Sequence, residues 1–498
     1  MRIYLLTVPL AKVPPILLAA VARGSKDSAE TLRDMHFQLT ELLHLVRIYP
    51  VSLSSDGTET ERKLQRLVGE AAHSVYEYAV PNTSTGCTIN LDIPLYHGYP
   101  SVMVQDSKHG LKTARNQLFT GARILVLGNF PCFYHQLLEF AKHPLGPLFN
   151  RDVEKVDRQD DRAAARLFSA ESLHFHLTHY PGQVGLSTYL FVMGELIDAW
   201  QNRNIHHCDR ARMVMRARYY LMAWRSHIIT HPDHAAHTHF ISRESFDIFL
   251  TLCDSLLSLI VIYRKFYPDF PLLPWLHSTE PCEHLFGVLR GLKKDFNYAD
   301  VLYLQPKLRI LILGAFGDLS AEEQAAQTAA GYHHTYFHAK DLNIEALKQW
   351  PSDGDLQQAS VAAFTEADQL LAAVGINASS MLAAYTAPDP SPKPTNTTTS
   401  AQRPQTLYEL MMLYANMPLS SRVEDQVEMC EMAIAADDVD KTMAMYVLYF
   451  HLQCLLRGSC SAALPDSTDD SLAVVRSNIK ENMIPSQVLL SPLIIYAT

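Results

Sequence analysis

The sequence of 498 residues predicts a mixed α/β sheet interrupted by a large all-helical insertion, followed by a helical C-terminal region. Two observations support this fold class. Over residues 1–129, short apolar runs alternate with helical patterns, and polar residues stand at the strand ends, as in a mixed α/β layer. Over residues 130–274, apolar side chains recur at spacings of three and four with charges between them, which is typical of helices.

The first elements are two short strands and a helix. Apolar runs at residues 3–8 and 16–22 are bounded by prolines and a glycine, which predicts a neighbouring pair of buried strands. Ser28 or Asp27 can cap the helix that follows, and its apolar side chains recur at helical spacing as far as Val46.

Two further predicted strands each end on a carboxylate. The strand over residues 46–54 ends at Asp56-Gly57, and the strand over 101–105 ends on Asp106; a helix follows each of them. Asp-Gly also suits a tight hairpin turn, and an Asp before a helix is a common cap. Because ligands gather at the carboxyl ends of strands in α/β sheets, we interpret Asp56 as a side chain pointing toward a metal or substrate site.

The remaining chain divides by composition. Residues 275–315 carry a strong helical pattern, and residues 316–385 predict a helical extension. Residues 386–405 are rich in Pro, Thr and Ser and have the composition of a disordered linker. Residues 406–498 predict a helical tail. The apolar run at 250–263 is too short to span a bilayer, so we expect a buried helix and no membrane partner.

Charge and cysteine usage limit the functional classes. The formal net charge of −10 argues against broad electrostatic wrapping of nucleic acid, but it does not exclude a local basic groove. Eight cysteines are scattered singly, which indicates a reducing compartment and packing roles.

Two sets of side chains allow alternative interpretations. Five histidines within residues 227–239 predict a surface loop or a pH-responsive patch in preference to a zinc site, because Pro232 and small residues are typical of a loop. Five arginines over residues 210–225 predict a solvated helix face with Tyr219, Tyr220 and Trp224 in the core. The alternative is phosphate binding with bases stacked on these aromatics.

Three segments occur in a suggestive order: SSDGTETER, then VQDSKHGLKTARNQLF, then, after the helical block, STEPCEHLFGVLR. Together they resemble the RNase H-like catalytic region of cut-and-paste DNA transposases, most closely the P element and THAP-type enzymes and more distantly the hAT enzymes. The resemblance covers about residues 1–315. It implies that Asp56 is the second catalytic Asp and Glu283 the third catalytic acid, and that both are metal ligands.

The resemblance also assigns supporting positions. The element Asp-x-x-His-x-x-Lys-x-x-x-Asn is matched by residues that share one helix face and that form, in the alternative interpretation, a polar structural network: Asp106, His109, Lys112 and Asn116, with Arg115 beside them. The second element, on the later helix, is matched by Glu280, Glu283, Phe286, Gly287 and Arg290. Without the resemblance, Glu283 would be a solvated helix residue.

The sequence departs from the family pattern at its beginning. In the family, the first catalytic Asp lies on a first strand, ahead of two more strands and a helix. Here the strand at residues 3–8 corresponds to the second strand, and the acids before Asp56 lie in the predicted helix. We therefore expect an N-terminally truncated core that lacks the first catalytic Asp. No Cys/His set with zinc-finger spacing precedes Asp56 either.

These features predict a transposase-derived protein with a degenerate DNA phosphoryl-transfer core that is inactive as written. Its ancestor would be a metal-dependent nuclease and strand transferase, and any surviving activity would need Mg²⁺ or Mn²⁺. The implied partners are double-stranded DNA, bound weakly, and further copies of the chain, and the implied compartment is the nucleus. The alternative is a non-enzymatic helical protein that binds protein or DNA.

Overall fold

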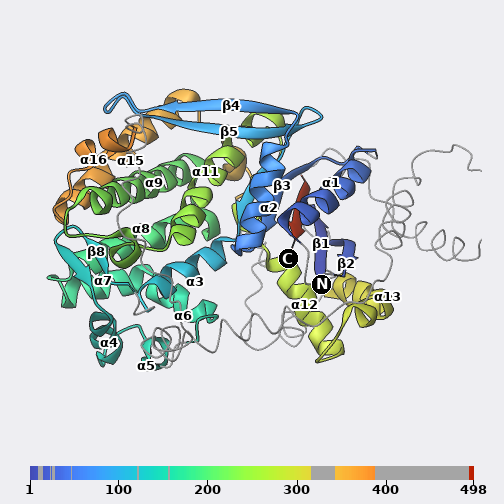
Figure 1. Cartoon of the computed structure of the whole chain (residues 1–498), viewed down its shortest axis with the longest axis horizontal. Helices are drawn as coiled ribbons and strands as arrows, with labels where there is room; N and C mark the ends of the chain where they lie inside the picture. The colour runs from blue at the N-terminus through green and yellow to red at the C-terminus, as the bar shows by residue number, and fades with distance from the viewer. Residues whose placement is uncertain are drawn as a thin grey trace, which may run out of the picture.

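The computed structural model describes residues 1–8, 15–22, 24, 28–45, 47–119, 123–154, 157–315, 343–386 and 493–497. It contains a five-stranded mixed sheet beside a large block of helices (Figure 1). The predicted mixed α/β class is confirmed, and the described part of residues 130–274 is mainly helical, with a short strand at Phe130–Cys132.

The five-stranded sheet has the order β2-β1-β10-β3-β7. In it, β1 (Arg2–Thr7) pairs antiparallel with both β2 (Ile16–Val21) and β10 (Leu493–Ala497), whereas β10, β3 (Pro50–Ser55) and β7 (Val102–Gln105) run parallel. The four strands predicted from the N-terminal part are therefore all present. Because β3 and β7 are parallel, their carboxyl ends lie at the same edge of the sheet.

The central strand β10 comes from the C-terminal end of the sequence, and the two chain ends lie close together (Figure 1). The prediction of a helical tail over 406–498 is wrong for the part that is described, because Leu493–Ala497 is a strand. A five-residue apolar run is too short for periodicity to separate a strand from a helix. The predicted linker at 386–405 lies outside the described residues except at Thr386.

Helices cover both faces of this sheet. On one face, α1 (Ala29–Leu45) packs against Leu53 and Ile495, with α2 (Glu59–Glu70) beside it. On the other face, α11 (Arg243–Phe266) packs on β7, and α12 (Glu280–Leu292) packs on β1 and β10. The start of α1 agrees with the sequence, since the Ser28 hydroxyl accepts a hydrogen bond from the Thr31 amide at 3.4 Å.

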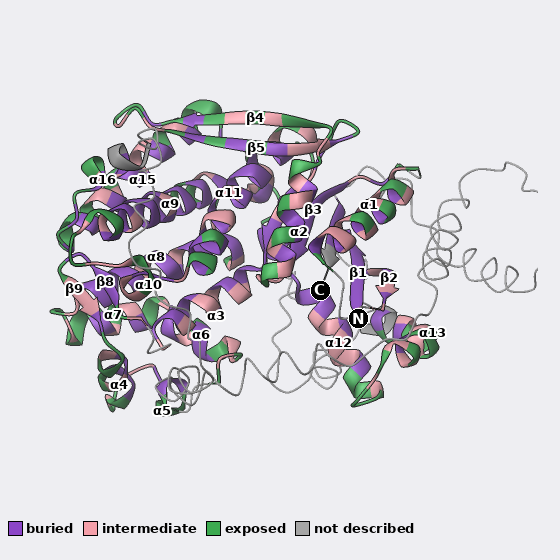
Figure 2. Ribbon diagram, in the orientation of Figure 1, coloured by how far each residue is buried: buried purple, intermediate pink, exposed green. Residues whose placement is uncertain are grey.

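The helical block is built around α9 (His207–Thr230), which is mostly buried (Figure 2). It packs against α11 and against α8 (Val184–Gln201), α15 (Asp353–Ala373) and α16 (Ala378–Thr386). The other helices of the described chain are α3 (Ser107–Gln117), α4 (Tyr134–Lys142), α5 (Asn150–Val153), α6 (Asp161–Leu167), α7 (Ala170–His179), α10 (Ala236–His239) and α13 (Tyr298–Ala315), with the 3₁₀ turns Pro274–Leu276 and Ala346–Lys348. Two very short strands, β8 (Leu125–Leu127) and β9 (Phe130–Cys132), form a hairpin within the block.

Helix α11 is long and apolar enough to cross a membrane, but 78% of its most apolar window is buried inside the protein. The expected buried helix at 250–263 is thus confirmed.

A three-stranded ribbon was not expected from the sequence. It consists of β4 (Ser74–Pro81), β5 (Thr88–Tyr96) and β6 (Tyr99–Pro100), and its first two strands run along α15 and α11 (Figure 1). The sequence pattern that could have predicted it is the alternation in β5, where Ile89, Leu91 and Ile93 are buried and the residues between them are exposed.

Strand β1 is tied to α2 by a buried ion pair. The Arg2 guanidinium donates to both carboxylate oxygens of Glu61, one of them at 2.9 Å, and both side chains are shielded from solvent. We expect Glu61→Gln to lower the free energy of unfolding by about 3–5 kcal/mol, because it leaves the buried Arg2 charge without its partner. Urea unfolding followed by circular dichroism measures this.

The matched control is Glu59→Gln, which lies in the same turn of α2 and is exposed. Its effect should stay within about 0.5 kcal/mol. Equal effects of the two substitutions would show that the ion pair does not hold β1 to α2.

Candidate functional site

The carboxyl ends of β3 and β7 bring Asp56 and Asp106 to one edge of the sheet. Ser55 and Gln105 are paired residues, and the Asp106 amide donates to the Ser55 carbonyl at 3.1 Å. Each Asp follows directly after its strand, as the sequence predicts. The two carboxylates therefore start from neighbouring strands, which are spaced about 5 Å apart.

Asp56 leads from β3 into a helix, so the hairpin alternative for Asp-Gly is wrong. Its carboxylate accepts a hydrogen bond from the Thr58 amide at 3.3 Å, which is a local turn contact. A Cβ at Gly57 would lie 2.8 Å from the terminal methyl group of Ile248 on α11, so that methyl group would have to shift to admit a larger residue. The half-buried Asp56 carboxylate is thus held where the sheet edge meets α2.

Asp106 joins three elements of the protein. It is 2% exposed and caps α3 by accepting from the amides of Lys108 (2.7 Å) and His109 (3.2 Å). Its second oxygen accepts from the amide (2.6 Å) and the hydroxyl (2.5 Å) of Thr279, the residue that starts α12. One carboxylate therefore fixes the ends of β7, α3 and α12 relative to one another.

Electrostatics keep Asp106 ionised. Burial acts to raise its pKa, but the hydrogen bonds from His109 and Thr279 and the charge of His109 outweigh that effect, so the pKa lies below its usual range. A carboxylate that accepts four hydrogen bonds has little capacity left to bind a metal ion.

Two more contacts join α3 to α12. The Lys108 ammonium bonds the buried Glu280 carboxylate at 2.9 Å. The His109 ring lies between two carboxylates, with Nδ1 3.7 Å from Asp106 and Nε2 3.7 Å from Glu283. The contact of Lys108 was not predicted from the sequence, because the motif includes His109 and leaves position 108 unspecified. The contact of Thr279 was not predicted either, because helix capping depends on local geometry.

Glu283 is half-buried, with 31% of its side chain exposed. Burial and the nearby Asp106 charge raise its pKa, whereas His109 and Lys112 lower it. The pKa of His109 is itself raised, because Asp106 and Glu283 outweigh the effect of burial. The carboxylate that acts on Glu283 most strongly is therefore Asp106 and not Asp56.

The other motif residues on α3 face the helical block. The Lys112 ammonium lies 3.1 Å from the Asp161 carboxylate, and the Arg115 guanidinium donates to the carbonyls of Asp152 (2.8 Å) and Asp157 (2.9 Å). Asn116 donates more weakly to the Arg158 carbonyl at 3.4 Å. These contacts form the polar structural network that the sequence left as an alternative.

The donor set does not fit a two-metal site. Two-metal phosphoryl transfer needs carboxylates shared between ions about 4 Å apart. Asp106 is consumed by its four hydrogen bonds, Glu283 faces His109, and none of the residues of β10 beside β3 is acidic. In the part of the chain that is described, neither Asp56 nor Glu283 belongs to a cluster of three His, Cys, Asp or Glu side chains with ligand atoms within 4.8 Å of one another.

The arginines of α9 do not form a surface for phosphates. Arg210 and Arg216 are buried, and Arg216 pairs with Glu195 and Glu366. Arg218 pairs with Asp254 at 2.7 Å. The expected solvated face is therefore wrong for Arg210 and Arg216, whereas Arg212 is exposed and pairs with Glu366. The expected core position of Tyr219, Tyr220 and Trp224 is confirmed.

A groove of about 800 Å³ runs between α2 and α11, along β5 and β7. Its charges are nearly balanced, which does not favour a polyanion. The basic residues are Arg62, Lys63, Arg66 and Arg243, and the acidic residues are Glu59, Asp92, Glu244, Asp247 and Asp254.

The histidine tract spans the end of α9, a loop and α10, with its rings partly exposed. His231 and His234 stack at 4.1 Å between ring centroids, and the His231 and His239 rings accept hydrogen bonds from backbone amides. The predicted surface loop is present at residues 231–235, whereas His227 lies in α9 and His237 and His239 lie in α10.

No protein-family model, curated protein or solved structure matches the chain. A functional proposal for it rests on its own residues and their geometry.

We expect Asp106→Asn to lower the free energy of unfolding by about 3 kcal/mol, since it removes a helix cap and places an amide donor against donors in a buried site. Chemical unfolding measures the change. The control is Asp157→Asn, an exposed residue that accepts one local hydrogen bond from Gln159 at 2.9 Å and should change little. Similar effects at both positions would refute the role of Asp106.

The contribution of Asp106 depends on pH. Its folded pKa is depressed, so the stabilisation is complete above the unfolded pKa of about 3.9 and is lost as the pH falls below that value. The stability difference between the protein and Asp106→Asn should therefore shrink between about pH 7 and about pH 3. A difference that stays constant over this range would contradict the ionised state.

Proposed function

We propose that this chain is a transposase-derived protein whose RNase H-like phosphoryl-transfer core lacks the first catalytic carboxylate and is inactive. The observation that carries the proposal is the central strand of the sheet. In the family pattern the first strand bears the first catalytic Asp, and it lies between the second strand and the strand that ends in Asp-Gly. Here β10 takes that position, between β1 and β3, with the sequence LIIYA.

The strand order supports the RNase H-like core. With β1, β2, β3 and β7 taken as the second to fifth strands of the family, the order is third, second, first, fourth, fifth, with the first position filled by β10. The antiparallel and parallel pairings also agree with that arrangement. The helical block intervenes between α3 and α12, where the resemblance expects an insertion.

The motif residues lie where a catalytic site would place them, but the bridging carboxylate is missing. Asp56 and Asp106 lie at one sheet edge, and Glu283 lies on a helix fixed to that edge through Asp106 and Thr279. The scaffold that would position catalytic acids is thus retained. What Mg²⁺ or Mn²⁺ requires in addition is a bridging carboxylate, and β10 supplies none.

A non-enzymatic interaction protein is the second candidate, and the internal contacts of the motif residues favour it. Lys112, Arg115 and Asn116 are each accounted for by bonds to the segment over residues 152–161. In that case the motif on α3 serves only to attach the helical block to the sheet.

The test of catalysis is a plasmid-cleavage assay with the full chain and Mg²⁺ or Mn²⁺. We expect no metal-dependent cleavage above the level of Asp56→Asn and Glu283→Gln. Asp92→Asn, an exposed carboxylate on β5, serves as the control for unspecific charge effects. Metal-dependent turnover that is abolished by Asp56→Asn and retained by Asp92→Asn would overturn the proposal.

Binding to double-stranded DNA separates the two candidates. A transposase-derived core should retain weak affinity that falls steeply as the salt concentration rises, because phosphate contacts release counterions. An interaction protein that binds only other proteins should show none at any salt concentration, because its net charge of −10 repels the phosphates. Fluorescence anisotropy with a labelled duplex measures this difference.

A further inference from the structure

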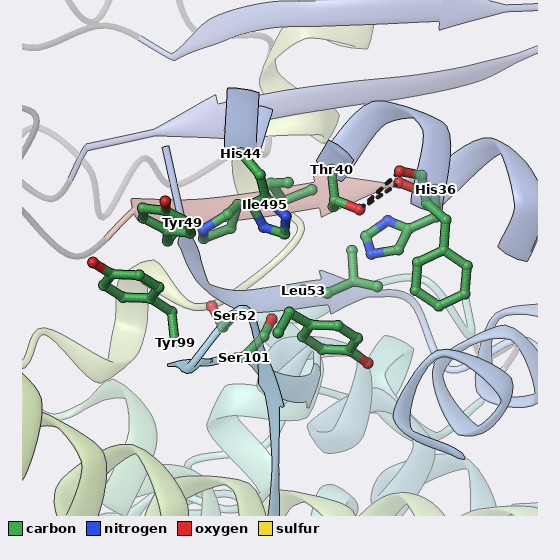
Figure 3. Close-up of a pocket in the computed structure, with 12 residues that line it drawn as sticks. His36, Thr40, His44, Tyr49, Ser52, Leu53, Tyr99, Ser101 and Ile495 are labelled. Atoms are coloured by element: carbon green, nitrogen blue, oxygen red, sulfur yellow. Dashed lines mark hydrogen bonds between the residues drawn. The ribbon is translucent and has the colours of Figure 1, made fainter. Parts of the chain in front are cut away.

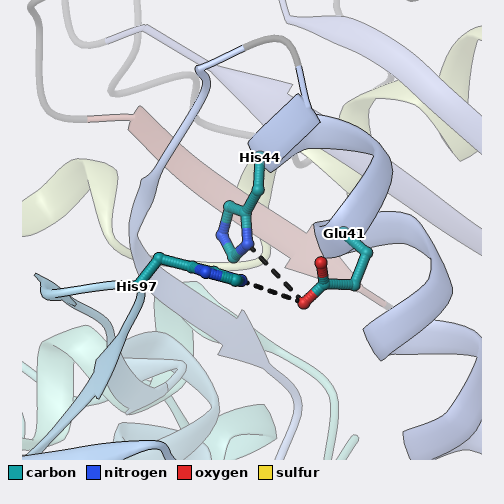
Figure 4. A group of neighbouring side chains, drawn as sticks. All are labelled: Glu41, His44 and His97. Atoms are coloured by element: carbon teal, nitrogen blue, oxygen red, sulfur yellow. Dashed lines mark hydrogen bonds and ion pairs between the residues drawn. The ribbon is translucent and has the colours of Figure 1, made fainter.

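Three potential metal ligands meet at the opposite edge of the five-stranded sheet from Asp56 and Asp106. They are Glu41 and His44 in the last turns of α1 and His97 in the turn between β5 and β6 (Figure 4). The ends of α1 and β6 lead into the starting ends of β3 and β7, whereas the two Asp residues follow the carboxyl ends of the same strands. The six residues of β3 separate the two edges by about 20 Å.

The ligand atoms are close enough to share one ion. The Glu41 carboxylate oxygen lies 3.1 Å from His97 Nε2 and 3.9 Å from His44 Nδ1, and all three atoms lie within 4.8 Å of one another. In a tetrahedral zinc site with ligand bonds of about 2.0–2.1 Å, neighbouring ligand atoms are about 3.4 Å apart. The two separations from the Glu41 oxygen, 3.1 Å and 3.9 Å, lie on either side of that value.

The backbone at His44 and at His97 has a regular local structure. At the end of α1, the Arg47 amide donates to the His44 carbonyl and the Ile48 amide donates to the Leu43 carbonyl, both at 2.9 Å, and Arg47 has a φ of 61°. This is the hydrogen-bond pattern of a Schellman cap. His44 is therefore placed by a capped helix end and not by a free loop.

His97 occupies the first position of a two-residue hairpin turn, because Tyr96 pairs with Tyr99. The φ angles of His97 and Gly98 are 52° and 84°, as a type I′ turn requires. Such turns favour Asn or Gly at the first position, and histidine is one of the non-glycine residues enriched at positive φ. The turn therefore fixes the point at which the His97 side chain leaves the backbone.

The Nδ1 atom of His44 is buried and has no hydrogen-bond partner, and its side chain is only 10% exposed. A neutral imidazole offers one nitrogen lone pair to a metal ion. Tyr49 stacks on this ring at 5.2 Å, and Tyr99 stacks on Tyr49 at 3.7 Å, which limits its rotation.

The neighbouring cavity leaves little room for an organic ligand. His44, Tyr49 and Tyr99 line a space of about 20 Å³ (Figure 3). This is enough for about one water molecule, whereas small-molecule pockets measure about 300–1,000 Å³. Of Glu41, His44 and His97, only His44 lines this cavity, so the cavity lies beside the three ligand atoms and adds no room for an organic ligand there.

We propose that Glu41, His44 and His97 bind Zn²⁺, with the fourth coordination position open to water. Two imidazole nitrogens and one carboxylate select a transition-metal ion over Mg²⁺ or Ca²⁺, which take oxygen ligands. The ion links the end of α1 to the turn between β5 and β6, and so joins the ribbon to the five-stranded sheet. This site is independent of the transposase-like carboxylates.

The test is Zn²⁺ titration of the chelator-treated full chain in competition with a chromophoric chelator. The variants His44→Ala and His97→Ala remove ligands. The control is the double variant His231→Ala/His234→Ala, because imidazoles also gather in the histidine tract. Circular dichroism of the metal-free proteins compares their folding.

We expect one tight site in the chain and in the control, and a loss of affinity of more than about 100-fold in each ligand variant. Residues that only orient metal ligands are typically worth 10–100-fold, so a ligand should be worth more. Absence of a tight site in the unsubstituted chain overturns the proposal, and so does full retention of the site in both ligand variants.

If the alanine variants fail to fold, Glu41→Gln decides the question. This side chain is 55% exposed, so the isosteric change should leave the fold intact. Bound Co²⁺, used as a visible probe of tetrahedral geometry, should lose most of its absorption in Glu41→Gln and keep it in Glu30→Gln, a half-exposed position on the same helix. Equal spectra in these two variants overturn the proposal.

Discussion

The buried carboxylate of Asp106 is the interaction on which the arrangement of the core depends. Asp106 follows β7 directly, its carboxylate caps the start of α3, and the same carboxylate accepts two hydrogen bonds from Thr279 at the start of α12. Asp106 and Thr279 are 173 positions apart in the sequence. The chain between them forms the helical block, so this contact fixes where the block leaves the sheet and where it returns. Lys108 and His109 extend the same junction to Glu280 and Glu283.

In the function that we propose, this dependence explains how the motif residues can be retained without catalysis. A carboxylate that is held by four donors and kept ionised stabilises the fold whether or not a metal ion binds nearby. The same applies to Lys112 and Arg115, whose contacts hold Asp152, Asp157 and Asp161 against α3. Loss of the bridging acid from the central strand would remove phosphoryl transfer and leave all of these bonds intact. The zinc site that we propose lies at the other sheet edge and would stabilise a different junction, between α1 and the ribbon.

The sequence predicted those elements whose signals are local. The strands that end at Asp56 and Asp106 and the buried helix α11 have strong apolar runs and clear ends, and the structure has all three. It did not predict β10 or the pairing that places it between β1 and β3, because strand pairing over most of the chain length leaves no periodic signal. Of the functional residues, too, only those with a local sequence signal were predicted. Asp106 and His109 were identified by their motif, whereas the cluster of Glu41 and His97 brings together residues 56 positions apart.

The central claim is that the C-terminal segment stands where an active transposase core carries its first catalytic Asp. Hydrogen–deuterium exchange of peptides covering Leu493–Ala497, compared with peptides from β1 and β3, tests it most directly. A central strand that pairs on both sides should exchange as slowly as its neighbours, because its amides open only with the sheet. Complete exchange of that peptide within seconds, while β1 and β3 stay protected, would contradict the account.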